Sequence, residues 1–133
     1  MTMRLLINLD VPELAPAQAL YCEAFELKVG RRFDGVVELL GAVAPIYLLQ
    51  KSADDPAAGL AERRYQRHWT PIHIDVVVDD LDYALARALR AGFALEGDIR
   101  EANWGRIAQL ADPFGHGWCL LQFLGRGYDE ITS

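Results

Sequence analysis

Four side chains in two copies of one sequence pattern have types that suit acid-base chemistry or the binding of a small molecule. The first copy contains Asn8 and Asp10, and the second contains His73 and Asp75. A histidine paired with a carboxylate can act as a general base, because the carboxylate orients the imidazole and stabilises its charged form. If the protein is an enzyme, we expect His73 and Asp75 to be catalytic, with Asp10 as another possible partner of the histidine.

The two copies belong to an internal repeat. The stretch 7–14 aligns with 74–81 at an offset of 67 residues, and Leu48-Leu49-Gln50 aligns with Leu120-Leu121-Gln122 at an offset of 72. A repeat of this length with different segment types inside it indicates two structural modules. We expect module 1 at about residues 1–51, a linker at 52–69 and module 2 at about 70–125, within a single domain.

Hydrophobic periodicity predicts the same βαβββ order in both modules, and hence an α+β fold. One helix is expected from Pro16 to Phe25, and a second from a cap at Asp79 or Asp80 to Gly92. A short helical patch is expected at 60–65, and the tail from 125 to 133 is expected to be peripheral. The predicted strands are 4–11, 29–33, 36–40, 45–50, 72–78, 94–99, 106–111 and 118–124.

Period-two alternation assigns the polar residues to one face of each sheet. Asn8 and Asp10 share a strand face, as do His73 and Asp75, while the apolar residues between them face a helix. With helices on the outer face, two such sheets would form a cup open to a ligand. The alternative is that Asn8, Asp10 and Asp75 are solvated residues near strand ends.

Composition excludes several classes of partner. The 133 residues are 52% hydrophobic with a formal net charge of -6, which disfavours nucleic acid and anionic membranes. No run is long enough to cross a bilayer, and the start of the chain lacks the pattern of a signal peptide. The two cysteines, Cys22 and Cys119, form no disulfide framework, so we expect a cytoplasmic protein.

Three stretches together resemble the vicinal oxygen chelate superfamily, which includes glyoxalase I, bleomycin-resistance proteins and extradiol dioxygenases. They are His73 to Leu81, Leu20 to Leu27, and Trp104 to Trp118, whose Asp-Pro-Phe-Gly-His turn is most similar to the bleomycin-resistance branch. The turn is also explained mechanically by Pro113 and Gly115, so His116 is expected to be an exposed turn residue rather than a catalyst. The resemblance implies cup-shaped sites and a homodimer.

The resemblance also implies a divalent metal in the cup, but the residues present depart from the usual ligands. The corresponding positions hold Leu6, Tyr47, His73 and Cys119. Leu6 has no donor atom, which leaves His73 and Cys119, with Asp75 as a strained third ligand. We therefore expect no metal or other cofactor, although a divalent ion stays possible.

Without the metal, binding is the favoured function. We expect a metal-free protein that binds a small organic ligand, with a lyase- or isomerase-type enzyme as the alternative. Phe33 and Trp69 are further aromatic candidates for the ligand site, and Trp118 is either a third or a core residue. The predicted ligand-binding residues are Asn8, Asp10, Tyr47, Trp104, Arg106 and Cys119.

Overall fold

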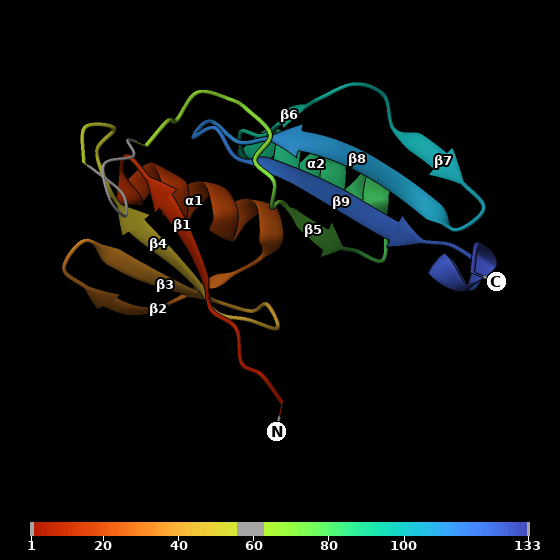
Figure 1. Ribbon diagram of the computed structural model, residues 1–133, viewed down its shortest axis with the longest axis horizontal. Helices are drawn as coiled ribbons and strands as arrows, with labels where there is room; N and C mark the ends of the chain where they lie inside the picture. Colours follow the sequence, from red (N-terminus) through yellow and green to blue (C-terminus); the bar gives the residue numbers. More distant parts are fainter. Residues whose placement is uncertain (1, 56–62, 133) are drawn as a thin grey trace. The chain divides into compact units, whose positions relative to one another are not determined.

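The computed structural model describes residues 2–55 and 63–132, and the chain divides into two compact units, Met1–Tyr65 and Gln66–Ser133. Within the described residues each unit holds one α-helix and one mixed β-sheet (Figure 1). The predicted linker contains the boundary between the units. Of its expected helical patch, residues 60–62 lie outside the described residues, and residues 63–65 are not helical, so this part of the prediction is wrong. In the described ranges, no helix is both long enough and apolar enough to span a membrane.

The first unit has the predicted βαβββ order. Its elements are β1 (Ile7–Val11), α1 (Leu14–Phe25), β2 (Lys28–Phe33), β3 (Val36–Leu40) and β4 (Ile46–Gln50). The strands lie in the order β1-β4-β3-β2, with β1 parallel to β4 and the other neighbours antiparallel. The helix α1 packs on one face of this sheet, mainly against β3 and β4.

The core of the first unit lies between α1 and the sheet. The helix begins two residues before the predicted start, and Pro16 lies in its first turn, where a missing N–H breaks no helical hydrogen bond. The apolar side chains of the inner face of α1, and those of the strands that alternate toward it, are almost fully buried. They are Leu9, Val11, Ala17, Leu20, Tyr21, Ala24, Val37, Leu39, Ile46 and Leu48.

The second unit repeats the order with one more strand. Its elements are β5 (Ile74–Val77), α2 (Leu81–Ala91), β6 (Ala94–Leu95), β7 (Arg100–Ala102), β8 (Gly105–Ala111), β9 (Gly117–Phe123) and the 3₁₀ turn η1 (Gly127–Glu130). The sheet runs β5-β9-β8-β6, and β7 also pairs with β8. The strands β5 and β9 are parallel, as β1 and β4 are in the first unit. The α+β class with two βαβββ units is thereby confirmed.

The predicted strand at 94–99 is wrong in its extent. Gly97 adopts a positive φ of 77° between β6 and β7, so the run bends and re-enters the sheet as a separate strand. Both pieces pair antiparallel with β8, at Ala94 with Ala111 and at Arg100 with Ile107. The second sheet therefore has five strands, where four were expected.

The core of the second unit lies between α2 and the sheet. Asp80, rather than Asp79, caps the helix by accepting a hydrogen bond from the backbone N–H of Tyr83. Leu89, near the C-terminal end of α2, has an exposed side chain and is not part of this core. The buried residues of this core are Leu81, Leu85, Ala88, Phe93, Ala108, Leu110, Trp118 and Leu120.

The turn between β8 and β9 is built around a buried carboxylate. Asp112 accepts hydrogen bonds from the backbone N–H groups of Phe114 and His116. Its other oxygen lies 2.8 Å from Nδ1 of His116 and accepts the indole N–H of Trp118. His116 is only 26% exposed and is held by Asp112, so its expected full exposure is wrong, although its structural role in the turn agrees with the prediction.

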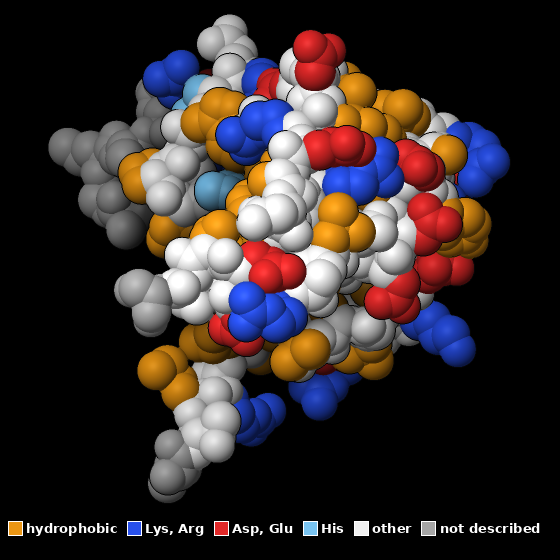
Figure 2. Space-filling model, turned by 90° about the vertical axis from the view of Figure 1, so that its right-hand side faces the viewer, with side chains coloured by type: hydrophobic (Ala, Val, Ile, Leu, Met, Phe, Trp, Pro, Cys, Tyr) orange, Lys and Arg blue, Asp and Glu red, His pale blue; other side chains and the backbone are white. Residues whose placement is uncertain are grey.

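The C-terminal residues are mostly exposed, as expected of a peripheral tail, but they are anchored to the second unit by aromatic contacts. Tyr128 of η1 packs edge-on against Phe123, with ring centroids 4.8 Å apart, and also lies against Trp104. Gly127 is buried at the same contact. The face drawn in Figure 2 intersperses acidic and basic side chains.

Candidate functional site

The open face of the first sheet carries polar side chains at one level across three strands. Asn8 of β1 lies opposite Tyr47 of β4, and Tyr47 lies opposite Glu38 of β3. Their strand neighbours Leu48 and Leu39 are buried under α1, so alternation turns the three polar side chains to the other face. Asn8 and Tyr47 thus lie side by side, as their predicted positions require.

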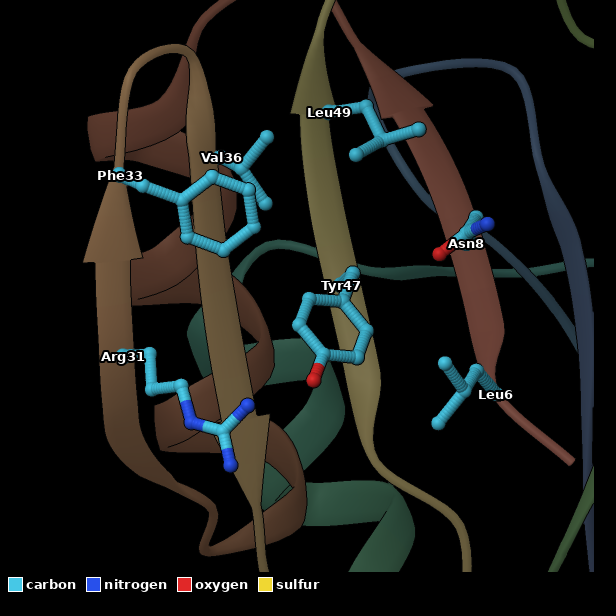
Figure 3. A pocket seen from close by; sticks show the side chains of 7 residues that line it. All are labelled: Leu6, Asn8, Arg31, Phe33, Val36, Tyr47 and Leu49. Atoms are coloured by element: carbon cyan, nitrogen blue, oxygen red, sulfur yellow. The ribbon is translucent and has the colours of Figure 1, made fainter. Parts of the chain in front are cut away.

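A shallow hollow of about 280 Å³ lies on this face. In Figure 3 the ring of Tyr47 lies between Arg31 and Asn8, with apolar side chains around them. Phe33 and Leu6, at the rim, are 57% and 56% exposed. The hollow is lined by Leu6, Asn8, Arg31, Phe33, Val36, Tyr47 and Leu49. Apolar walls around a few polar groups are typical of small-molecule sites.

Glu38 and Arg31 are polar residues of this face that were not predicted from the sequence. Glu38 is the more buried of the two. It is only 5% exposed, accepts the phenol O–H of Tyr47 at 2.8 Å and accepts the backbone N–H of Arg31 at 2.9 Å. These bonds, the one from Arg31 first, lower the pKa of Glu38, and the carboxylate in turn raises the pKa of Tyr47. The sequence does contain one sign of this residue. Glu38 lies between Val37 and Leu39, which alternation assigns to the core, so its own side chain is expected on the open face.

Asp10 lies on the same face but has a partner outside the hollow. Its Oδ2 accepts a hydrogen bond from Nε of Arg63 at 2.7 Å, and both side chains are partly buried. Asp10 is opposite Leu49 in the sheet. The ion pair fixes the carboxylate of Asp10 against the second half of the linker, and its predicted contact with a ligand stays a prediction.

His73, Asp75 and Cys119 form a polar cluster on the open face of the second sheet. Nε2 of His73 lies 3.2 Å from Oδ1 of Asp75, and Asp75 is opposite Cys119 in the parallel β5–β9 pair. One potential ligand atom from each residue lies within 4.8 Å of the others. The second unit alone therefore brings together the three residues that sequence analysis considered for a metal.

Cys119 differs from its two partners in burial. Its side chain is only 2% exposed, whereas His73 and Asp75 are open to solvent. Burial first, and then the adjacent carboxylate of Asp75, raise the pKa of the Cys119 thiol to about 11. The thiol is therefore protonated at neutral pH and is a poor nucleophile.

The segment 66–73 adds an aromatic side chain beside this cluster. The ring of Trp69 lies edge-on to His73, with centroids 5.3 Å apart, and the guanidinium of Arg67 stacks 4.2 Å above the indole. Arg67 also forms a bidentate salt bridge with Glu96. Gly117 leaves room for this arrangement, because a Cβ there would lie 2.5 Å from the indole.

The predicted position of Arg106 on the open face is wrong. Arg106 pairs with Gln122, whose side chain accepts the backbone N–H of Leu81 at the start of α2. The guanidinium accordingly forms ion pairs with Asp82 of α2, at 3.1 Å, and with Glu101 of β7, at 2.8 Å. The register of β8 with β9 determines on which face of the sheet Arg106 lies, and the sequence does not show that register.

The other two tryptophan candidates have structural partners. Trp104 lies in the turn between β7 and β8, where alternation assigns no face, and its ring is 5.2 Å from that of Tyr128. Its predicted ligand contact stays a prediction. Trp118 is buried in the core and packs edge-on against Phe93, which confirms the core alternative.

The donor set of the second unit fits a divalent metal in number and type. Catalytic zinc sites usually have three protein ligands and an open fourth position, and imidazole, thiolate and carboxylate all bind zinc. The same three side chains also satisfy one another, since Asp75 is paired with His73 and hydrogen-bonded to Cys119. A metal bound there would polarise a carbonyl group or acidify a water molecule.

Sequence comparison identifies the family. The model of the glyoxalase-like domain matches residues 6–121, so the chain belongs to that family. Uncharacterized proteins of Mycobacterium bovis and Mycobacterium tuberculosis are 31% identical over 133 residues. The alignments cover 95% of this chain and 88% and 78% of those proteins, respectively.

Solved structures share the fold at lower identity. A hypothetical protein from S. aureus has a TM-score of 0.73 at 18% identity, over 92% of this chain and 94% of that one. The fosfomycin resistance protein FosX from Listeria monocytogenes has a TM-score of 0.71 at 18% identity, over 92% and 93%. A glyoxalase/bleomycin resistance protein/dioxygenase from Nocardioides has a TM-score of 0.67 at 18% identity, over 96% and 88%. The predicted superfamily is thus confirmed.

Proposed function

We propose that the protein binds a small organic molecule in the hollow on the open face of the first sheet, and that binding needs no metal. The observation that carries this proposal is the lining of the hollow, where exposed apolar side chains surround Asn8, Arg31 and Tyr47. Burial of such apolar surface by a ligand is favourable, and a few fixed polar groups supply orientation. Resistance to fosfomycin, a small organic compound, appears in the name of a protein with this fold.

The proposed metal independence is supported by the side chains of the hollow. Leu6 has no donor atom, and the carboxylate beside Tyr47, that of Glu38, is already engaged by two hydrogen bonds. The cytoplasm is proposed as the location, supported by the two free thiols of Cys22 and Cys119.

Titration of the labelled protein with a library of small organic fragments, followed by amide NMR, tests the proposal. Fragments that bind the hollow should shift the resonances of Asn8, Phe33 and Tyr47. Phe33→Ala should weaken binding severalfold, because it removes an exposed ring from the rim. Tyr83→Ala, at a residue of similar exposure on α2, is the control and should leave binding unchanged. A library that shifts none of the hollow resonances contradicts the function.

A second candidate function is catalysis at the cluster of the second unit. The specific observation is the distance of 3.2 Å between Nε2 of His73 and the carboxylate of Asp75, which suits a histidine base with an orienting partner. Elemental analysis of the purified protein separates the candidates. About one zinc, nickel, iron or manganese per chain, lost in His73→Ala, would overturn metal-free binding in favour of a metal-dependent enzyme.

We also propose a homodimer, as expected from the sequence. Large apolar side chains stay exposed in the described part of each unit, and contiguous exposed apolar surface often marks an interface. Examples are Met3, Leu6, Ile72 and Val77. Light scattering across micromolar concentrations should give twice the chain mass, and a constant monomer mass would refute the dimer.

A further inference from the structure

We infer that Glu38 fixes Tyr47 as a hydrogen-bond acceptor, so that the hollow selects amphipathic anions that carry an O–H or N–H donor. This inference rests on the proposed function of the hollow and names the class of ligand. Its parts are a β-bulge, a buried carboxylate, a phenol with a committed proton and an exposed guanidinium.

The bulge lies in β2, directly opposite Glu38. The register pairs Val29 with Leu39 and Arg32 with Val37, so the two residues Gly30 and Arg31 face the single residue Glu38. A bulge leaves a backbone N–H without a ladder partner. Here the N–H of Arg31 donates to Oε1 of Glu38 at 2.9 Å.

Gly30 makes the space that the carboxylate occupies. A Cβ at this position would lie 2.5 Å from Oε1 of Glu38 and 2.9 Å from Cδ1 of Leu40. Only glycine therefore permits this position of Glu38 without a shift of its neighbours. Bulge and glycine together hold a nearly buried carboxylate on a sheet face that is otherwise open.

The carboxylate determines which way Tyr47 can hydrogen-bond. An ionised carboxylate only accepts, and a phenol has one proton to donate. Because Tyr47 donates that proton to Oε2 of Glu38 at 2.8 Å, only the lone pairs of its oxygen are left for a ligand. A ligand group that contacts this oxygen must be a donor.

Arg31, which lines the hollow, supplies hydrogen-bond donors and so favours an acceptor group on the ligand. Its side chain is 79% exposed, and its Nε lies 3.9 Å from Oε1 of Glu38. The remaining N–H groups of a guanidinium suit a carboxylate or a similar anion. The apolar lining of Leu6, Phe33 and Leu49 then receives the body of the ligand (Figure 3).

A matched pair of probes tests the selection. Mandelate carries a phenyl ring, a carboxylate and a hydroxyl donor, and its O-methyl ether keeps everything except the donor. Calorimetric or NMR titration of the whole chain should give at least about fivefold tighter binding of mandelate, the worth of one ordinary hydrogen bond. Hollow resonances should shift with both compounds.

Three variants assign the preference to its parts. Glu38→Gln keeps an acceptor for the backbone N–H of Arg31 but turns an amide donor toward the oxygen of Tyr47. The phenol proton then points into the hollow, so the preference for mandelate should fall or reverse toward the ether. Tyr47→Phe should remove the preference, and Arg31→Gln should weaken both probes alike. The controls are Tyr65→Phe and Arg32→Gln. The hydroxyl of Tyr65 donates to the backbone carbonyl of Lys51, and the guanidinium of Arg32 donates to Gln18 of α1.

The outcomes separate this inference from the function on which it rests. Equal binding of both probes in the hollow, or a preference unchanged in folded Glu38→Gln, overturns the role of Glu38 while the binding function stands. Failure of mandelate to bind overturns the ligand class, while other fragments that shift the hollow resonances keep the function. Thermal unfolding of each variant shows that a loss of preference does not reflect a loss of fold.

Discussion

Tyr47 and Cys119 occupy equivalent positions in the two units, but the carboxylate next to each of them lies on a different neighbouring strand. Each lies in the strand parallel to the first strand of its unit, beside Asn8 in one case and Asp75 in the other. On the antiparallel side Tyr47 faces Glu38, whereas Cys119 faces Gln109. The carboxylate is thus on the antiparallel partner in the first unit and on the parallel partner in the second.

This difference changes how each ionisable group is controlled. The pKa of Tyr47 is raised chiefly by its hydrogen bond to Glu38, and that of Cys119 chiefly by burial. The pKa of Tyr47 therefore depends on a specific partner, and that of Cys119 on the exclusion of water. A repeated frame fixes the positions of side chains, while the residues placed there decide whether the face binds, orients or merely packs.

The largest effect is expected from filling the space under Glu38. Gly30→Ala would place a Cβ 2.5 Å from its carboxylate, so Glu38 must move and release Tyr47. We expect loss of ligand binding in the hollow and a cost of about 1–3 kcal/mol in the free energy of unfolding. Denaturant unfolding and NMR titration measure both.

A glycine of the second unit with an equally short Cβ contact, Gly117 of β9, sharpens this comparison. Gly117→Ala displaces Trp69 and Arg67 instead, and should leave binding in the first unit intact. Equal loss of binding in both variants would mean that the effect is general destabilisation rather than release of Glu38.

The next effect is on stability in alkaline solution. Folding raises the pKa of the Cys119 thiol from 9.0 to about 11. The contribution of the protonated thiol to the free energy of unfolding is therefore fully present below about pH 9 and is lost as the pH rises toward 11. The loss should be about 3 kcal/mol at most, because each of the two pKa units corresponds to about 1.4 kcal/mol. Cys119→Ala should remove this part of the pH dependence, measured by urea unfolding across that range. An unchanged pH profile in the variant would show that the thiol is not the group responsible.

The smallest effect concerns the causes of the two raised pKa values. Glu38→Gln should bring the pKa of Tyr47 down toward its ordinary value, because it removes the first cause. Asp75→Asn should lower the pKa of Cys119 less, since burial persists. Ultraviolet absorbance of tyrosinate and of thiolate follows the two titrations. A larger response of Cys119 than of Tyr47 would reverse the contrast between the two units.

Sequence reasoning predicted those features that depend on short-range patterns. The alternation of polar and apolar residues placed Asn8, His73 and Asp75 on open faces, and the repeat placed both helices. The relation of the two sheets as one cup, the dimer and the absence of a cofactor stay predictions.

Features that depend on pairing between distant strands were not predictable in this way. The side on which Arg106 lies follows from its pairing with Gln122. The place of Glu38 requires the bulge at Gly30, and a bulge inserts a residue without any fixed signature in the sequence. Trp104 is in a turn, where a period of two has no meaning.

The split of one predicted strand into β6 and β7 also affects how the protein resists aggregation. Exposed strand edges can template pairing with other chains, and short, charged or irregular edges suppress it. The far edge of the second sheet consists of one piece of two residues and one of three, bent apart at Gly97 and bearing Arg100 and Glu101. Because both pieces are short, they offer few backbone groups to an added strand, which disfavours edge-to-edge pairing with another chain.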